Sequence, residues 1–164
     1  VRRLGVAQAL VHEPPILVVD EPTVGLDPEE RLRFRRLMAK LGRERIVVLS
    51  THIVADLGSR RSDLTLIDKG KVQFRGSPAE LVARARGSVF TVDLAPGEAV
   101  DVDADLEVVS HVETSAGTSI RGVSMGGRAP AGAQAVDDPT LEEAYLAFMA
   151  DRGRADAAQM EGQS

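Results

Sequence analysis

The sequence predicts an α/β fold with a parallel sheet, followed by a small α+β module at its C-terminal end. Two aliphatic runs, ILVV at 16–19 and IVVL at 46–49, show no polar alternation. Such runs are typical of strands buried on both faces of a parallel sheet. A helical pattern lies between them, as the crossover of a parallel pair requires. After residue 87, short strand-like segments separated by loops replace this alternation.

The charge of the chain changes at nearly the same place. Residues 1–75 carry 14 basic and 10 acidic side chains, a balance of +4, whereas residues 76–164 carry 6 and 15, a balance of −9. A step of this size indicates two parts with different roles. The net charge of −5 argues weakly against non-specific nucleic-acid binding.

Composition excludes several classes of protein and site. The 43% of hydrophobic and 27% of charged residues are ordinary for a globular protein. No cysteine is present, so disulfides, thiolate metal sites and cysteine nucleophiles are excluded. The longest aliphatic runs have four residues, far short of the roughly 20 that a membrane-spanning helix needs.

The elements of the first part follow from local signals. Residues 1–11 read as the end of a helix, and the prolines at 14 and 15 stop it. Asp27 followed by Pro28 predicts a helix start, and an apolar stripe continues to about Leu41 before Gly42 ends the helix.

Further along, the pattern predicts a short helix over 53–59 and a third strand over 63–68. The Lys69-Gly70 turn returns the chain as a hairpin strand over 71–75. Ser77 and Pro78 then begin a helix over 79–86.

The second part reads as strands over 88–94, 106–112 and 119–123, and Asp138-Pro139 is expected to start a helix over 140–149. We therefore expect three regions. Residues 1–87 form the α/β part, 88–150 a small accessory domain, and 151–164 a disordered tail.

Polar residues that could carry chemistry follow the two aliphatic strands. Asp20 and Glu21 come directly after the first strand, and His52 follows the second. The carboxyl ends of parallel strands open on the same edge of a sheet, where ligands bind. A carboxylate pair can hold a divalent cation and orient a water, and a histidine can bind an anion. Taken singly, a strand end turning into solvent explains Asp20 and Glu21 equally well, and an isolated histidine at a strand end is better explained as one whose hydrogen bonds are satisfied.

Together, these residues stand in motifs that resemble a known family. ILVVDEPTVGLDP resembles the Walker B and D-loop segment of ATP-binding-cassette (ABC) ATPases, and LSTHI resembles their switch-histidine loop. The opening VRRLGVAQALVHEPP is similar to the helix that follows the family's signature loop, and KGKVQFRGSPAEL to the segment that closes the catalytic domain. The resemblance covers residues 1–84 and implies part of a P-loop NTPase sheet.

The resemblance also implies roles for single residues. Asp20 would help to hold Mg²⁺, usually through water, and Glu21 would polarise the water that attacks the γ-phosphate of ATP. His52 would contact that phosphate. Gly25 and Asp27 would lie in the loop that crosses to a second ATPase subunit of a homodimer, with ATP between the subunits.

Two elements of that family are missing from the 164 residues. The P-loop pattern GxxxxGK[ST] is absent, since Gly70-Lys71 is followed by Val72 and Thr65 stands at the position of the first glycine. The signature LSGGQ is absent too, and the weak lookalike at 123–127 reads as a loop. We therefore expect the C-terminal portion of an ABC ATPase that does not bind or hydrolyse ATP measurably by itself.

As a whole, the resemblance implies the ATPase subunit of a bacterial export-type ABC transporter, partnered by a separate transmembrane permease. Such a subunit is cytoplasmic and peripheral on the inner face of the cell membrane. No nucleic-acid partner is expected, because the basic run at 31–45 reads as a solvated helix face with interleaved glutamates. Two alternatives stay open: a non-transport ABC ATPase acting on DNA or the ribosome, and a non-enzymatic remnant or regulatory module built on residues 88–150.

Overall fold

The computed structural model describes residues 2–54, 57, 63–96 and 106–161. The chain forms two compact units, residues 1–59 and residues 60–164. Each unit is described by itself.

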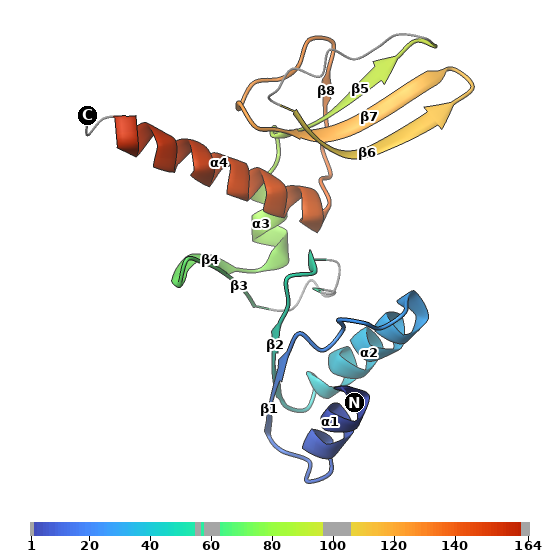
Figure 1. Ribbon diagram of the computed structural model, residues 1–164, viewed down its shortest axis with the longest axis vertical. Helices are drawn as coiled ribbons and strands as arrows, with labels where there is room; N and C mark the ends of the chain where they lie inside the picture. The colour runs from blue at the N-terminus through green and yellow to red at the C-terminus, as the bar shows by residue number, and fades with distance from the viewer. Residues whose placement is uncertain (1, 55–56, 58–62, 97–105, 162–164) are drawn as a thin grey trace. The chain divides into compact units, whose positions relative to one another are not determined.

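The first unit is a two-stranded parallel sheet with two helices (Figure 1). Its elements are α1 (Arg2–Leu10), β1 (Ile16–Asp20), α2 (Pro28–Leu41) and β2 (Ile46–Ser50). The strands pair in register from Ile16 opposite Ile46 to Asp20 opposite Ser50. The predicted parallel pair is therefore confirmed, and the carboxyl ends of both strands lie side by side.

The parallel sheet is buried on one face only within the described residues. Leu17 and Val19 are buried, whereas Ile16, Val18, Ile46 and Val48 on the other face are 49–69% exposed. The expectation of strands buried on both faces was wrong for this set of residues. Both helices, α1 and α2, contact the strands, and Figure 1 shows them on the same side of the sheet.

Helix α2 begins where the sequence predicts. Asp27 is its N-cap residue and accepts a hydrogen bond from the Glu30 amide at 2.7 Å, Pro28 stands in the first turn, and Gly42 is the C-cap. Most of the helix expected at 53–59 lies outside the described residues. Within it, the Ile53 amide donates to the Thr51 hydroxyl and the Leu57 amide donates to the Val54 carbonyl, each at 3.0 Å.

Replacing Asp27 by alanine is expected to lower the free energy of unfolding by about 1 kcal/mol, because the Glu30 amide loses its acceptor. Chemical denaturation monitored by circular dichroism measures this loss. Serine at the same position keeps a capping oxygen and should recover most of it. Equal stabilities for the serine and alanine variants would contradict the capping role.

The second unit begins with a hairpin and a helix. Strands β3 (Leu64–Asp68) and β4 (Lys71–Gly76) pair antiparallel, and both turn residues, Lys69 and Gly70, have positive φ. Helix α3 (Pro78–Arg84) follows, with a complete capping box between Ser77 and Glu80. The hairpin is confirmed. The third predicted strand pairs within the hairpin, so the parallel sheet has two strands in the described part of the chain.

An antiparallel sheet forms the rest of the second unit. Its strand order is β6-β7-β5-β8, from β5 (Val89–Leu94), β6 (Leu106–Thr114), β7 (Gly117–Ser124) and β8 (Gln134–Ala135). Helix α4 (Leu141–Glu161) contacts this sheet through β7 and β5 and also packs on α3. Figure 1 shows α4 lying between the sheet and α3.

Two expectations about the C-terminal helix need correction. Helix α4 begins at Leu141 after Thr140, not at Asp138-Pro139. It continues to Glu161, so most of the tail expected to be disordered at 151–164 is helical. Tertiary packing also divides the chain at 59/60, which places the hairpin and α3 with the C-terminal module. The boundary at 87/88 stays a prediction.

Candidate functional site

The ends of β1 and β2 bring together the polar residues that the sequence singles out. Asp20 is the last residue of β1 and lies opposite Ser50, the last residue of β2. The Ser50 hydroxyl donates a hydrogen bond to Oδ1 of Asp20. The serine thus orients the carboxylate of Asp20, a residue that is exposed at the strand end.

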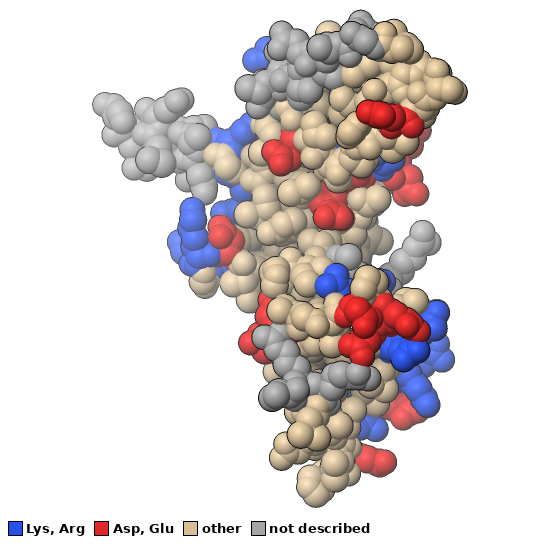
Figure 2. Space-filling view, turned by 45° about the vertical axis from the view of Figure 1, so that its right-hand side comes forward, with Lys and Arg blue, Asp and Glu red and all other residues tan. Residues whose placement is uncertain are grey.

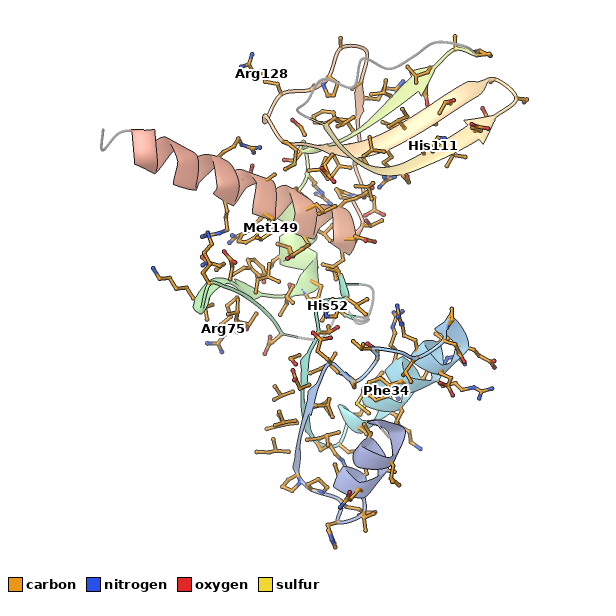
Figure 3. The ribbon with its side chains drawn as sticks, in the orientation of Figure 1. Phe34, His52, Arg75, His111, Arg128 and Met149 are labelled. Carbon is orange, nitrogen blue, oxygen red and sulfur yellow. The ribbon has the colours of Figure 1, made fainter. Side chains whose placement is uncertain are left out.

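Glu21 and His52 form the second contact of the site. One carboxylate oxygen of Glu21, Oε1, accepts a hydrogen bond from the His52 amide at 3.0 Å and lies 2.8 Å from the ring nitrogen Nδ1. Figure 3 labels His52. The His52 side chain is 70% exposed and that of Glu21 is 31% exposed. The expected convergence of Glu21 and His52 across 31 residues of sequence is therefore present.

The backbone at Glu21 has an unusual conformation. Its φ is +44°, which lies in the left-handed region of backbone conformation. Residues other than glycine adopt this region rarely, at a cost of about 1–2 kcal/mol. The Glu21 amide still donates to the Ser50 carbonyl at 3.0 Å, which ties the residue to the end of β2. A strained residue held by its neighbours is common at functional sites. Here the strain turns the chain out of β1 immediately before the loop to α2.

That loop carries the other two predicted site residues. Gly25 has a φ of +80°, which favours glycine, and no atom lies within 4 Å of where a Cβ would stand. The side chain of Asp27 caps α2. Neither residue contacts Glu21 or His52 in any interaction that the structure defines among the described residues. Gly25 thus allows the loop to turn, and Asp27 ends the loop by capping α2.

The described residues contain no cluster of three or more His, Asp or Glu side chains that could hold a metal ion. Asp20 offers one anchored carboxylate. Mg²⁺ usually keeps several waters and binds one or two carboxylates together with substrate phosphates. The donor set at Asp20 thus fits magnesium carried with a nucleotide and does not fit a metal held by protein ligands alone.

No helix in the described residues is long and apolar enough to cross a membrane.

Sequence reasoning missed a buried ion pair in the second unit. Glu143 on α4 is 2% exposed and forms a two-pronged pair with Arg121 on β7, in which Nη2 lies 2.8 Å from Oε2. The Thr140 amide also donates to Oε2 at 2.7 Å, and the Glu143 amide donates to the Thr140 hydroxyl at 3.2 Å. The Thr-x-x-Glu spacing of a capping box was the available signal.

The charges of this pair shift both ionisation equilibria. Burial raises the pKa of Glu143, but the hydrogen bonds from Arg121 and Thr140 lower it by more than burial raises it. The pKa of Glu143 therefore lies below its ordinary value. The same contact with Glu143 raises the pKa of Arg121. Glu143 is therefore a buried carboxylate whose charge is compensated.

Comparison with known proteins shows similarity to one group. No family model matches the chain. An uncharacterized ABC transporter ATP-binding protein of Bacillus subtilis is 33% identical over 93 residues, 57% of this chain and 32% of the relative. A Nod factor export ATP-binding protein of Burkholderia orbicola is 34% identical over 118 residues, 71% of this chain and 39% of the relative. An energy-coupling factor transporter ATP-binding protein of Lactiplantibacillus plantarum is 39% identical over 82 residues, which are 49% of this chain and 28% of the relative.

The chain is thus similar, over about half to seven tenths of its length, to ATP-binding proteins of bacterial ABC transporters. It spans no more than about two fifths of the length of these relatives. The similarity agrees with the family that the motifs at 16–28 and 49–53 resemble.

Proposed function

We propose that this chain is part of the ATP-hydrolysing subunit of an ABC transporter, which drives export through a separate permease. The observation that carries the proposal is the contact between Glu21 and His52 beside Asp20, at the joined ends of two parallel strands. Similarity to transporter ATP-binding proteins supports the same assignment.

In this proposal Glu21 is the general base. Its carboxylate is oriented by two hydrogen-bond donors of His52, so it is held in position to accept a proton from a water molecule. General-base catalysis by a positioned carboxylate contributes about 10²–10⁴-fold to a rate. His52 binds Glu21 through Nδ1, and Nε2 on the far side of the ring donates to a phosphate oxygen when the imidazole carries both protons.

Asp20 is the residue proposed to hold magnesium, through a water molecule. The Ser50 hydroxyl keeps its carboxylate oriented, which is the usual support for a metal-bound carboxylate. Bound with ATP, magnesium would neutralise charge on the phosphate oxygens. Gly25 and Asp27 are proposed to place their loop against a second ATPase subunit. The subunit would work at the inner face of the cell membrane, on the cytoplasmic side.

By itself, the chain of 164 residues is expected to bind ATP with a Kd weaker than about 1 mM. The sequence contains no GxxxxGK[ST] loop, and such a loop supplies the backbone amides and lysine that hold phosphates. Isothermal titration with ATP and Mg²⁺ measures this. The control is a chimera in which the P-loop-bearing segment of an ABC transporter ATP-binding relative precedes residue 1. Saturable micromolar binding by the chain alone would overturn the prediction.

A further inference from the structure

A cavity of about 220 Å³ lies between α3 and α4 of the second unit. On the α4 side, its apolar lining includes Ala144, Ala147 and Phe148, and both alanines are buried. The charged residues that line it are Arg84, Asp151 and Arg152. Pockets for drug-sized ligands usually hold roughly 300–1,000 Å³, so this cavity fits a smaller occupant.

The charges in this lining do not cancel. Asp151 is paired with Arg154, which stands outside the lining, so its carboxylate already has a cation. Within the described residues, neither Arg84 nor Arg152 forms an ion pair. Glu80, one turn before Arg84 on α3, uses its carboxylate to cap that helix. The cavity therefore presents two arginines that no described carboxylate pairs with.

Aromatic side chains hold Arg84 in position. Its guanidinium carbon lies 5.0 Å from the ring centroid of Phe74, which is a cation–π contact. The Phe74 ring packs edge-to-face with the ring of Phe148, with their centroids 5.9 Å apart. Phe74 is itself buried. The cation is therefore placed before any ligand binds, which lowers the entropy that binding costs.

The overall charge of this part of the chain does not attract anions. Residues 76–164 have a balance of −9, and Figure 2 shows acidic as well as basic side chains on the visible surface. At physiological salt, exposed charges more than about 8 Å apart are largely screened. Attraction of an anion to the cavity would thus come from its two arginines at short range.

We propose that this cavity binds a small organic carboxylate whose apolar body is about the size of one aromatic ring. The carboxylate pairs with Arg84 and Arg152, since a guanidinium binds a carboxylate through two parallel hydrogen bonds. The ring packs on Phe148 and the two alanines. A bare phosphate would leave the apolar lining uncovered, and a neutral ring would leave both cations unpaired. Because α3 and α4 both line the cavity, the ligand joins the two helices.

The test uses the whole chain, without nucleotide, and three probes: benzoate, benzyl alcohol and inorganic phosphate. Methyl resonances of Ala144 and Ala147 report occupancy of the cavity. They should show benzoate binding at least about tenfold more tightly than either other probe. Benzoate should also raise the Tm of the second unit, and added salt should weaken its binding.

Matched variants separate the cavity from general attraction of anions. Arg84→Met and Arg152→Met should each weaken benzoate binding by about tenfold or more, because each removes a charged donor and keeps an apolar side chain. Arg152→Met serves if Arg84→Met unfolds the chain. Arg86→Met changes an exposed arginine outside the lining and should leave the affinity unchanged. Equal binding of benzoate and either other probe, an equal loss in Arg86→Met, or unmoved alanine resonances would each overturn the proposal.

Discussion

Replacing Glu21 by glutamine is expected to lower steady-state ATP hydrolysis by about 100- to 10,000-fold, while nucleotide binding stays unchanged. The measurement uses the chimera that supplies a P-loop before residue 1. Glutamine keeps the size of the side chain and can keep its bonds to His52, but it does not accept a proton from water. The loss should therefore appear in the turnover number and not in the Kd for ATP.

Glu13→Gln is a matched control for this experiment. Glu13 is also a glutamate with positive φ, and it stands before β1, apart from the contacts of Glu21. Its amidation should leave the hydrolysis rate within about twofold, the ordinary range of a surface substitution. Hydrolysis at the wild-type rate in the Glu21→Gln chimera would refute the assignment of the base. A matching loss in Glu13→Gln would show that the assay reports a general effect of charge.

The site could be predicted from sequence because its geometry follows from local rules. Two aliphatic runs joined by a helix give parallel strands, and parallel strands place Asp20 and Ser50 opposite each other. Glu21 follows Asp20 directly and His52 comes two residues after Ser50, so the two side chains have little freedom to lie apart. The capped start of α2 and the Lys69-Gly70 turn were predictable for the same reason, because each depends on the residues immediately around it.

The sequence analysis missed one feature that depends on a contact between distant residues and another that was judged from composition alone. The ion pair between Arg121 and Glu143 joins residues 22 positions apart, and nothing in either local pattern indicates the other partner. Residues 151–161 were expected to be disordered because they are small and polar, yet they continue α4. Alanine, arginine, glutamine and methionine are all good helix formers, so propensity was the better guide there. The parallel sheet formed by β1 and β2 was expected to be buried on both faces, yet one face is exposed. An apolar run in a sequence predicts burial but does not identify the element that packs on it.

The ion pair between Arg121 and Glu143 should give the largest effect on stability. Arg121→Met is expected to lower the free energy of unfolding of the second unit by about 2–3 kcal/mol, because it leaves the Glu143 carboxylate buried without its cation. Thermal or chemical denaturation measures the loss. Arg121→Met/Glu143→Leu removes both charges and should recover much of it. Glu142→Gln, an exposed neighbour on the same turn, should change stability by less than about 0.5 kcal/mol.

The pH dependence of Glu143→Gln tests the same pair through its charge. The pKa of Glu143 in the folded protein lies below its ordinary value of 4.5. The folded state therefore binds the proton less readily than the unfolded state. The charge of Glu143 thus stabilises the fold above about pH 4.5, and this contribution is lost as pH falls through the lowered pKa. Wild type should be more stable than Glu143→Gln at pH 7, and the difference should shrink in acid. A difference that stays constant from pH 7 to pH 3 would mean that glutamine changes packing rather than charge.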